Sequence, residues 1–253
     1  MDQLAAVDMP RRNAPNRYVQ LVNGIDAFFR SAPPFRRYGE LATLLQIAGR
    51  DGWSSFLEGV DSGWTEEEAG SSADELIGFT KLSLYRSTEL GYQLRLHIWW
   101  NGRRTFDMYP HEHRWPLASA VMCGQLRIVN FDVLVHDAPA PDAETLISHL
   151  LFDGDRDGRK RIEVEGPVGL APTSDYVVGA GGTHCLHGTG AHQVFNWTDN
   201  VSATLVVTGP AFRDFSRSFR GAETAEGATK ARAHWTHRDI TDTLRRVMTH
   251  VEC

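Results

Sequence analysis

The sequence predicts a mainly β protein, built as an antiparallel sandwich or barrel, with helices before and after it. Short runs rich in Val, Ile, Phe and Trp recur between residues 92 and 207. Gly, Asp, Pro and Asn separate these runs, which favours many short strands joined by tight turns. Apolar residues spaced three and four apart appear near both ends of the sequence and predict amphipathic helices there.

Composition limits the classes of function. The 253 residues fit one large domain or two small ones, and 42% apolar with 23% charged residues is ordinary for a globular protein. A net charge of −6 gives no basic face for nucleic acid. Three scattered cysteines, no signal pattern in the first thirty residues and no apolar run long enough for a membrane helix predict a cytoplasmic protein without a membrane partner.

The first seventy residues favour helices. Residues 1–16 indicate a loose leader with little apolar content. Apolar stripes predict helices over Tyr18–Phe29 and Tyr38–Phe56, the second with Gly49 as an interruption. The acidic, Gly- and Ser-rich segment Gly63–Ala73 predicts a loop.

The period then changes to two residues, as expected for strands. In Tyr92–Trp100, polar and aliphatic residues alternate. Further strands are predicted at Ser119–Met122, Gln125–Val135, Arg161–Glu163, Tyr176–Val178, Gln193–Trp197 and Ser202–Val207. Pro139–Leu151 predicts an inserted helix capped by Asp142, and His237–Val251 predicts a closing helix capped by Thr236.

The histidines are the most informative side chains. On a strand, His111 and His113 point to the same side and can present two imidazoles to one metal ion. Taken alone, such a pair fits equally well two histidines that alternate by chance. A second group, His184, His187 and His192, lies among glycines that permit tight turns. In a β barrel, ligands from separate strands can converge, which favours a metal site.

The spacing of these residues resembles the cupin pattern over about residues 90–210. That pattern places a Gly before a His-x-His, then a Glu and a closing Gly. Its second block runs from Gly through Pro-x-Gly to His and Asn. The positions that match are His111, His113, Gly124, Gly181, His192 and Asn196. The positions that depart are Thr105 for the first Gly, Leu117 for the Glu, His187 for the Pro and Thr189 for the inner Gly.

The resemblance implies a cupin-like double-stranded β-helix barrel over residues 74–215. An N-terminal helical extension, 1–73, would pack on it, and a loop and helix, 216–253, would follow. It also implies a mononuclear metal held by His111, His113 and His192. With Leu117 in place of the carboxylate, the ligand set is similar to that of thiol dioxygenases.

Three neutral imidazoles suit an anionic substrate and dioxygen, because the charge of the ion stays uncompensated. The family points to Fe(II), while imidazole ligation alone also fits other divalent transition metals.

Four residues near the histidines are candidates for substrate binding. Arg95 and His97 share one face of a strand, and an inward Arg95 could pair a substrate carboxylate; if that face points outward, both are solvated. By alternation, Trp115 shares the side of the His pair, as a pocket wall or as core. Tyr109 lies just before the pair, and ordinary packing is its alternative role.

Two further residues are candidate acid or base groups. Tyr176 carries a titratable hydroxyl, with ordinary packing as its alternative. His187 stands where the family has Pro, and its alternative is a solvated loop histidine.

The sequence therefore predicts an iron(II) oxygenase or dioxygenase that acts on a small anionic molecule. A redox-neutral metal-dependent isomerase, lyase or hydrolase and a non-catalytic ligand-binding module remain open as alternatives. Exposed sheet edges commonly pair, so we expect a homodimer.

Overall fold

The computed structural model of the chain describes residues 16–31, 38–49, 53–61, 73–74, 79–100, 109–135, 146–152, 161–221 and 235–251. Its helices are α1 (Arg17–Ser31), α2 (Tyr38–Gly49), α3 (Trp53–Asp61) and α5 (His237–Val251). Its strands are β1 (Ala73–Asp74), β2 (Thr80–Arg86), β3 (Gln93–Trp99), β4 (His111–Glu112), β5 (Leu117–Cys123), β6 (Gln125–Val135), β7 (Leu146–Phe152), β8 (Ile162–Gly179), β9 (Thr183–Leu186), β10 (Ala191–Asn196), β11 (Ser202–Thr208) and β12 (Phe215–Gly221).

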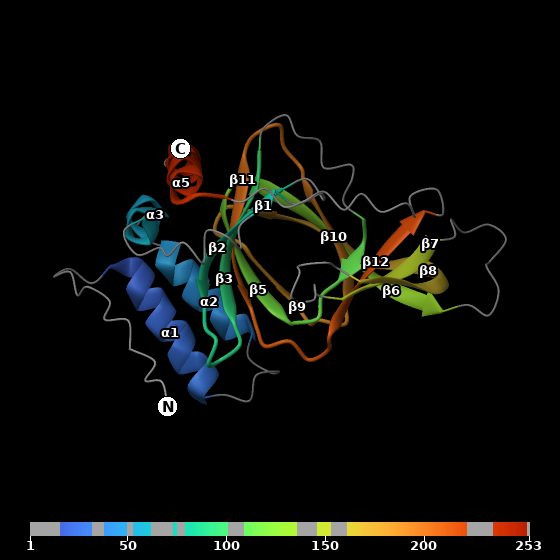
Figure 1. Cartoon of the computed structure of the whole chain (residues 1–253). Helices are drawn as coiled ribbons and strands as arrows, with labels where there is room; N and C mark the ends of the chain where they lie inside the picture. The colour runs from blue at the N-terminus through green and yellow to red at the C-terminus, as the bar shows by residue number, and fades with distance from the viewer. Residues whose placement is uncertain are drawn as a thin grey trace, which may run out of the picture.

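The strands form two antiparallel sheets. The first, sheet A, has the order β1-β2-β3-β11-β5-β9, and the second, sheet B, closes on itself in the order β10-β4-β12-β7-β8-β6. The helices gather on one side of the molecule, whereas β6, β7, β8 and β12 extend away from them on the other side (Figure 1). A mainly β fold with helices at both ends is thus confirmed.

The main core lies between the helices and sheet A. Along β3, Leu94, Leu96 and Ile98 are fully buried in the same apolar cluster as α1, α2, α3 and α5. Because side chains alternate along a strand, Arg95 and His97 point to the opposite face of sheet A, toward sheet B. The apolar core between the helices and sheet A therefore fixes the position of β3, and the opposite face of that strand carries Arg95 and His97.

Two residues of the matched sequence pattern shape tight turns. Gly124 joins β5 to β6 with φ +73, and a Cβ there would meet the Oγ of Ser202 and the carbonyl oxygen of Val201. Asn196 ends β10, donating from Nδ2 to the carbonyl of Asn200 at 2.8 Å and accepting from the Ser202 hydroxyl at 2.8 Å. Gly124 is required for its backbone conformation, whereas Asn196 stabilises its turn through side-chain hydrogen bonds.

The inserted helix predicted over Pro139–Leu151 is wrong where the structure describes it. Leu146–Phe152 is strand β7, paired with β8 on one side and β12 on the other. Its aliphatic residues suit either period, and two ladders of backbone hydrogen bonds decide for the strand. The proposed cap, Asp142, lies outside the described residues.

One strand is longer than predicted: the runs Arg161–Glu163 and Tyr176–Val178 lie at the two ends of β8. The interruption predicted at Gly49 is confirmed, because α2 ends there and α3 follows from Trp53. Strand β12 continues to Gly221.

Of the remaining predictions near the chain ends, only the closing helix falls wholly on described residues. The predicted leader, residues 1–16, and the predicted loop over Gly63–Ala73 lie almost wholly outside the described residues. The closing helix is confirmed as α5, where Thr236 Oγ1 accepts from the Asp239 amide at 3.3 Å and Asp239 accepts from the Thr236 amide at 2.8 Å. No described helix combines the length and the apolar character that spanning a bilayer requires.

Candidate metal centre

Three histidine rings meet between the sheets: His111 lies on β4, His113 follows directly after that strand, and His192 lies on β10. One ligand atom from each of His111, His113 and His192 lies within 4.8 Å of the others. Backbone pairing places His192 of β10 directly opposite His111 of β4. The Nε2 atoms of His113 and His192 are 3.0 Å apart. These distances are short enough for the three nitrogen atoms to bind one metal ion together.

The backbone orients the first ring. The Nδ1 of His111 lies 3.0 Å from the carbonyl oxygen of Tyr109. A carbonyl only accepts, so Nδ1 carries the proton and Nε2 keeps the lone pair that a metal needs. Tyr109 therefore serves the group through its backbone, while its ring packs 5.1 Å from the Arg220 guanidinium.

Burial keeps the three rings neutral. It lowers the pKa of His111 below 6.5, partly opposed by the hydrogen bond to Tyr109. It lowers the pKa of His113 and His192 further, and neighbouring histidines add to the effect. Neutral imidazole is the form that binds metal, so the rings need no deprotonation at neutral pH.

Strand pairing places residues of neighbouring strands directly side by side, so their side chains form rows across each sheet. One row of sheet A contains, from strand to strand, Ser83, Arg95, Val206, Ser119 and His184. The neighbouring row contains Lys81, His97, Thr204 and Val121. A row of sheet B contains Asn130, His192, His111, Ser218 and His149. None of the residues in these rows is acidic.

Arg95 and Trp115 lie on one side of the three histidines. The Trp115 ring stacks on His113 with ring centroids 6.1 Å apart and planes at 18°. The Arg95 guanidinium lies 4.8 Å from the Trp115 ring and donates to Gln93 Oε1 at 2.6 Å. The structure thus brings two candidate substrate-binding residues to the group.

His97 and Lys81 stand in the second row of sheet A. The two residues are directly opposite each other on β2 and β3, so their side chains share one face. Phe79 covers the His97 ring with a centroid distance of 4.6 Å. Burial and then the charges of Arg95 and Lys81 lower the pKa of His97 well below 6.5.

The two candidate acid or base residues, Tyr176 and His187, lie in different places relative to the three histidines. Tyr176 of β8 lies 2.7 Å through its hydroxyl from Nδ1 of His184, and the His184 ring stacks on His192 with centroids 5.8 Å apart. His187 is exposed on the turn after β9. The structure joins Tyr176 to the histidine group through His184 and does not bring His187 to it.

Leu117 occupies the position that the cupin pattern assigns to Glu. It is 6% exposed and packs in a small apolar cluster with Leu186 and Val206. The group therefore contains three histidines and no carboxylate among the described residues.

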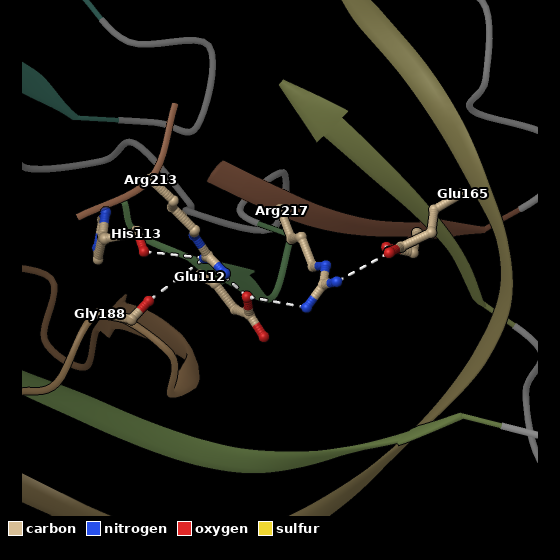
Figure 2. Close-up of polar contacts among 7 residues, drawn as sticks. Glu112, His113, Glu165, Gly188, Arg213 and Arg217 are labelled. Atoms are coloured by element: carbon tan, nitrogen blue, oxygen red, sulfur yellow. Dashed lines mark hydrogen bonds and ion pairs between the residues drawn. The ribbon is translucent and has the colours of Figure 1, made fainter. Parts of the chain in front are cut away.

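A charged network supports the group from the other side of β4 (Figure 2). Glu112, 3% exposed, accepts from Arg213 Nη2 at 2.7 Å and lies 3.6 Å from Arg217. The same Arg213 nitrogen donates to the carbonyl oxygen of His113 at 2.9 Å and approaches that of Gly188 at 3.4 Å. Arg217 continues the network to Glu165 at 2.8 Å.

Sequence reasoning missed Lys81 and Arg213 as parts of this region, and left the role of His184 open. Lys81 alternates with apolar residues in β2, which was a detectable strand signal. His184 and Arg213 gave no local signal, because their positions depend on pairing between distant strands.

Comparisons with known proteins show a limited structural likeness. No family model and no curated protein match the chain. The Cnp3 cupin domain of Schizosaccharomyces pombe has 6% identity and a TM-score of 0.31, covering 52% of this chain and 61% of that domain.

Two other solved structures match at a comparable level. A hydroquinone 1,2-dioxygenase in complex with Cd²⁺ and 4-hydroxybenzonitrile has 18% identity and a TM-score of 0.33, covering 58% of this chain and 71% of its own. A cupin superfamily protein from Desulfitobacterium hafniense has 10% identity and a TM-score of 0.29, covering 52% and 77%. These similarities are too low to transfer a function.

Proposed function

We propose that this chain is a mononuclear non-haem iron(II) dioxygenase of the cupin type that acts on a small anionic organic substrate. The observation that carries the proposal is the convergence of His111, His113 and His192 within 4.8 Å. Three nitrogen donors without a carboxylate leave coordination positions open and leave the charge of a divalent ion uncompensated.

The residues present fit such an ion. His111 offers Nε2 because Nδ1 is engaged by Tyr109, and the partly buried ring of His113 and the buried ring of His192 are neutral. When bound, iron(II) supplies the one-electron redox chemistry that lets dioxygen react with an organic molecule. The sequence resemblance favours iron, while the donor set alone also accepts other divalent transition metals.

The surrounding side chains favour an anion. Arg95 and Lys81 bring two positive charges to the face of sheet A opposite the histidines, and the aligned rows contain no acidic residue. A guanidinium recognises a carboxylate in a planar, bidentate manner. Arg95 would orient the carboxylate, and Trp115 would exclude water beside His113.

The test combines metal analysis with oxygen consumption. Protein purified without a chelating tag is loaded with Fe(II) anaerobically, its iron is counted, and oxygen uptake is followed with a panel of small carboxylates and phenolates. We expect one bound iron, substrate-dependent uptake, and loss of both in His113→Ala. Full uptake by metal-free His113→Ala would contradict the proposal. Equal turnover without oxygen would favour the redox-neutral alternative instead.

A further inference from the structure

A fourth histidine, His184, stands beside the metal-binding group without belonging to it. Its ring stacks on His192 at a centroid distance of 5.8 Å and an angle of 14°. The residue is 7% exposed, and its Nε2 has no hydrogen-bond partner among the described residues. A buried polar atom left without a partner costs free energy, which a bound ligand would recover.

The hydrogen bond with Tyr176 determines which nitrogen of His184 carries the proton. Burial raises the pKa of the Tyr176 hydroxyl, so the phenol keeps its hydrogen, and a phenol is a stronger hydrogen-bond donor than a neutral imidazole N–H. The phenol hydrogen is then directed to His184 Nδ1, 2.7 Å away. In a neutral imidazole, an accepting Nδ1 leaves the proton on Nε2. His184 therefore offers an N–H donor.

The position of this donor complements that of Arg95. Both residues belong to one row of sheet A, separated by Val206 of β11 and Ser119 of β5. Arg95 reaches the histidine group on the side of His113 through Trp115, whereas His184 reaches it on the side of His192. The candidate metal position thus lies between a guanidinium and a neutral N–H donor.

We propose that His184, held by Tyr176, is a substrate-binding residue that donates a hydrogen bond from Nε2 to an oxygen of an organic oxyanion bound at the three-histidine group. This inference rests on the proposed function. It names the substrate class as a small carboxylate-type anion whose oxygens face Arg95 on one side and His184 on the other.

The experiment separates binding of the metal from binding of the anion. Co(II) replaces iron because its visible absorption reports both events, and acetate is the probe anion. His184→Phe keeps an aromatic ring against His192 and removes the donor. Tyr176→Phe keeps the imidazole and removes the group that fixes its proton. His250→Phe, an exposed histidine on α5, is the matched control.

We expect His184→Phe to bind Co(II) like the wild type and to bind acetate roughly 10-fold more weakly or worse, as expected for a lost hydrogen bond to a charged group. Tyr176→Phe should show a smaller loss of acetate affinity, and His250→Phe none. Unchanged acetate affinity in His184→Phe would overturn the inference. A loss of Co(II) affinity in that variant would assign His184 to the metal and also overturn it.

Two further outcomes are decisive. If near-ultraviolet circular dichroism shows that His184→Phe does not fold, Tyr176→Phe decides, and unchanged acetate affinity there overturns the inference. If the wild-type protein binds no Co(II), the proposed function itself fails, together with the inference that depends on it.

Discussion

Individual histidines in this protein acquire their chemistry from burial and from one or two neighbours. The Tyr109 carbonyl fixes the proton of His111, and Tyr176 faces Nδ1 of His184. Burial lowers the pKa of His184 to about 4. Burial removes part of the hydration that would stabilise imidazolium, so each ring favours its neutral form.

The low pKa of His97 predicts a pH dependence of stability in the metal-free protein. Below pH 6.5 the unfolded chain binds a proton at this residue that the folded chain rejects, because burial, Arg95 and Lys81 oppose it. Stability is therefore complete above pH 6.5 and declines as the pH falls toward the lower folded value.

Urea unfolding measured between pH 7.5 and pH 5 checks this prediction. His97→Gln should lose less stability on acidification than the wild type, by up to about 1.4 kcal/mol per pH unit for one proton. The exposed His250→Gln serves as control and should follow the wild type. Equal pH slopes in His97→Gln and the wild type would show that His97 does not contribute.

Spacing within the sequence was sufficient to select His111, His113 and His192. The first two follow from alternation along a strand, and the third from its register in a known pattern. The place of His184 could not be predicted in this way, because it depends on β9 pairing with β5 so that His184 faces Ser119. Such pairing is set by tertiary packing and not by local residue preference.

At the scale of elements, the two-residue strand β4 depends on its neighbours. It pairs with β10 through His111 and with β12 through His111 and Glu112. A strand this short has little stability of its own. Arg213 adds a link by binding Glu112 and the His113 carbonyl together (Figure 2).

We therefore predict that Arg213→Ala weakens Co(II) binding by roughly 10-fold or more, since residues that orient metal ligands typically contribute that much. Isothermal titration with Co(II) measures the effect. Arg217→Ala is a matched control: Arg217 also lies near Glu112, at 3.6 Å, and is bonded to Glu165. It should lose stability without a comparable loss of metal affinity. Equal effects of the two variants would assign Arg213 a purely structural role.

The predicted elements differ from the observed ones where the period was ambiguous. In β7 the aliphatic residues allow either a helix or a strand, and pairing with β8 and β12 decides. In β8 the residues Gly166, Pro167 and Pro172 interrupt the alternating pattern, so the sequence indicates two short runs where one long strand exists.

At the scale of the whole molecule, sheet A lies between the helices and the candidate site, with one face toward each. Leu94, Leu96 and Ile98 face the helices, and Arg95 and His97 stand on the other side of the same strand. Helix α5, last in sequence among the described elements, completes the apolar layer with Ile240, Leu244 and Val247.

Leu244→Ala should accordingly lower the free energy of unfolding by about 2–5 kcal/mol, the usual effect of removing a buried leucine side chain. Leu244 is 1% exposed, whereas its neighbour Arg245 lies on the surface of α5. Arg245→Ala, followed by thermal and urea unfolding under the same conditions, is the control and should change little. A similar small effect of Leu244→Ala would show that α5 contributes little to the core.

The positive charges of Lys81 and Arg95, in neighbouring rows of sheet A, also affect the stability of the protein when no reaction takes place. Lys81 and Arg95 place two positive charges on one face of sheet A, and both attract an entering anion. A well-matched anion should thus raise the melting temperature even when no oxygen is present and nothing is converted. Thermal-shift screening of small organic acids could in this way reveal a preferred guest before any reaction is identified.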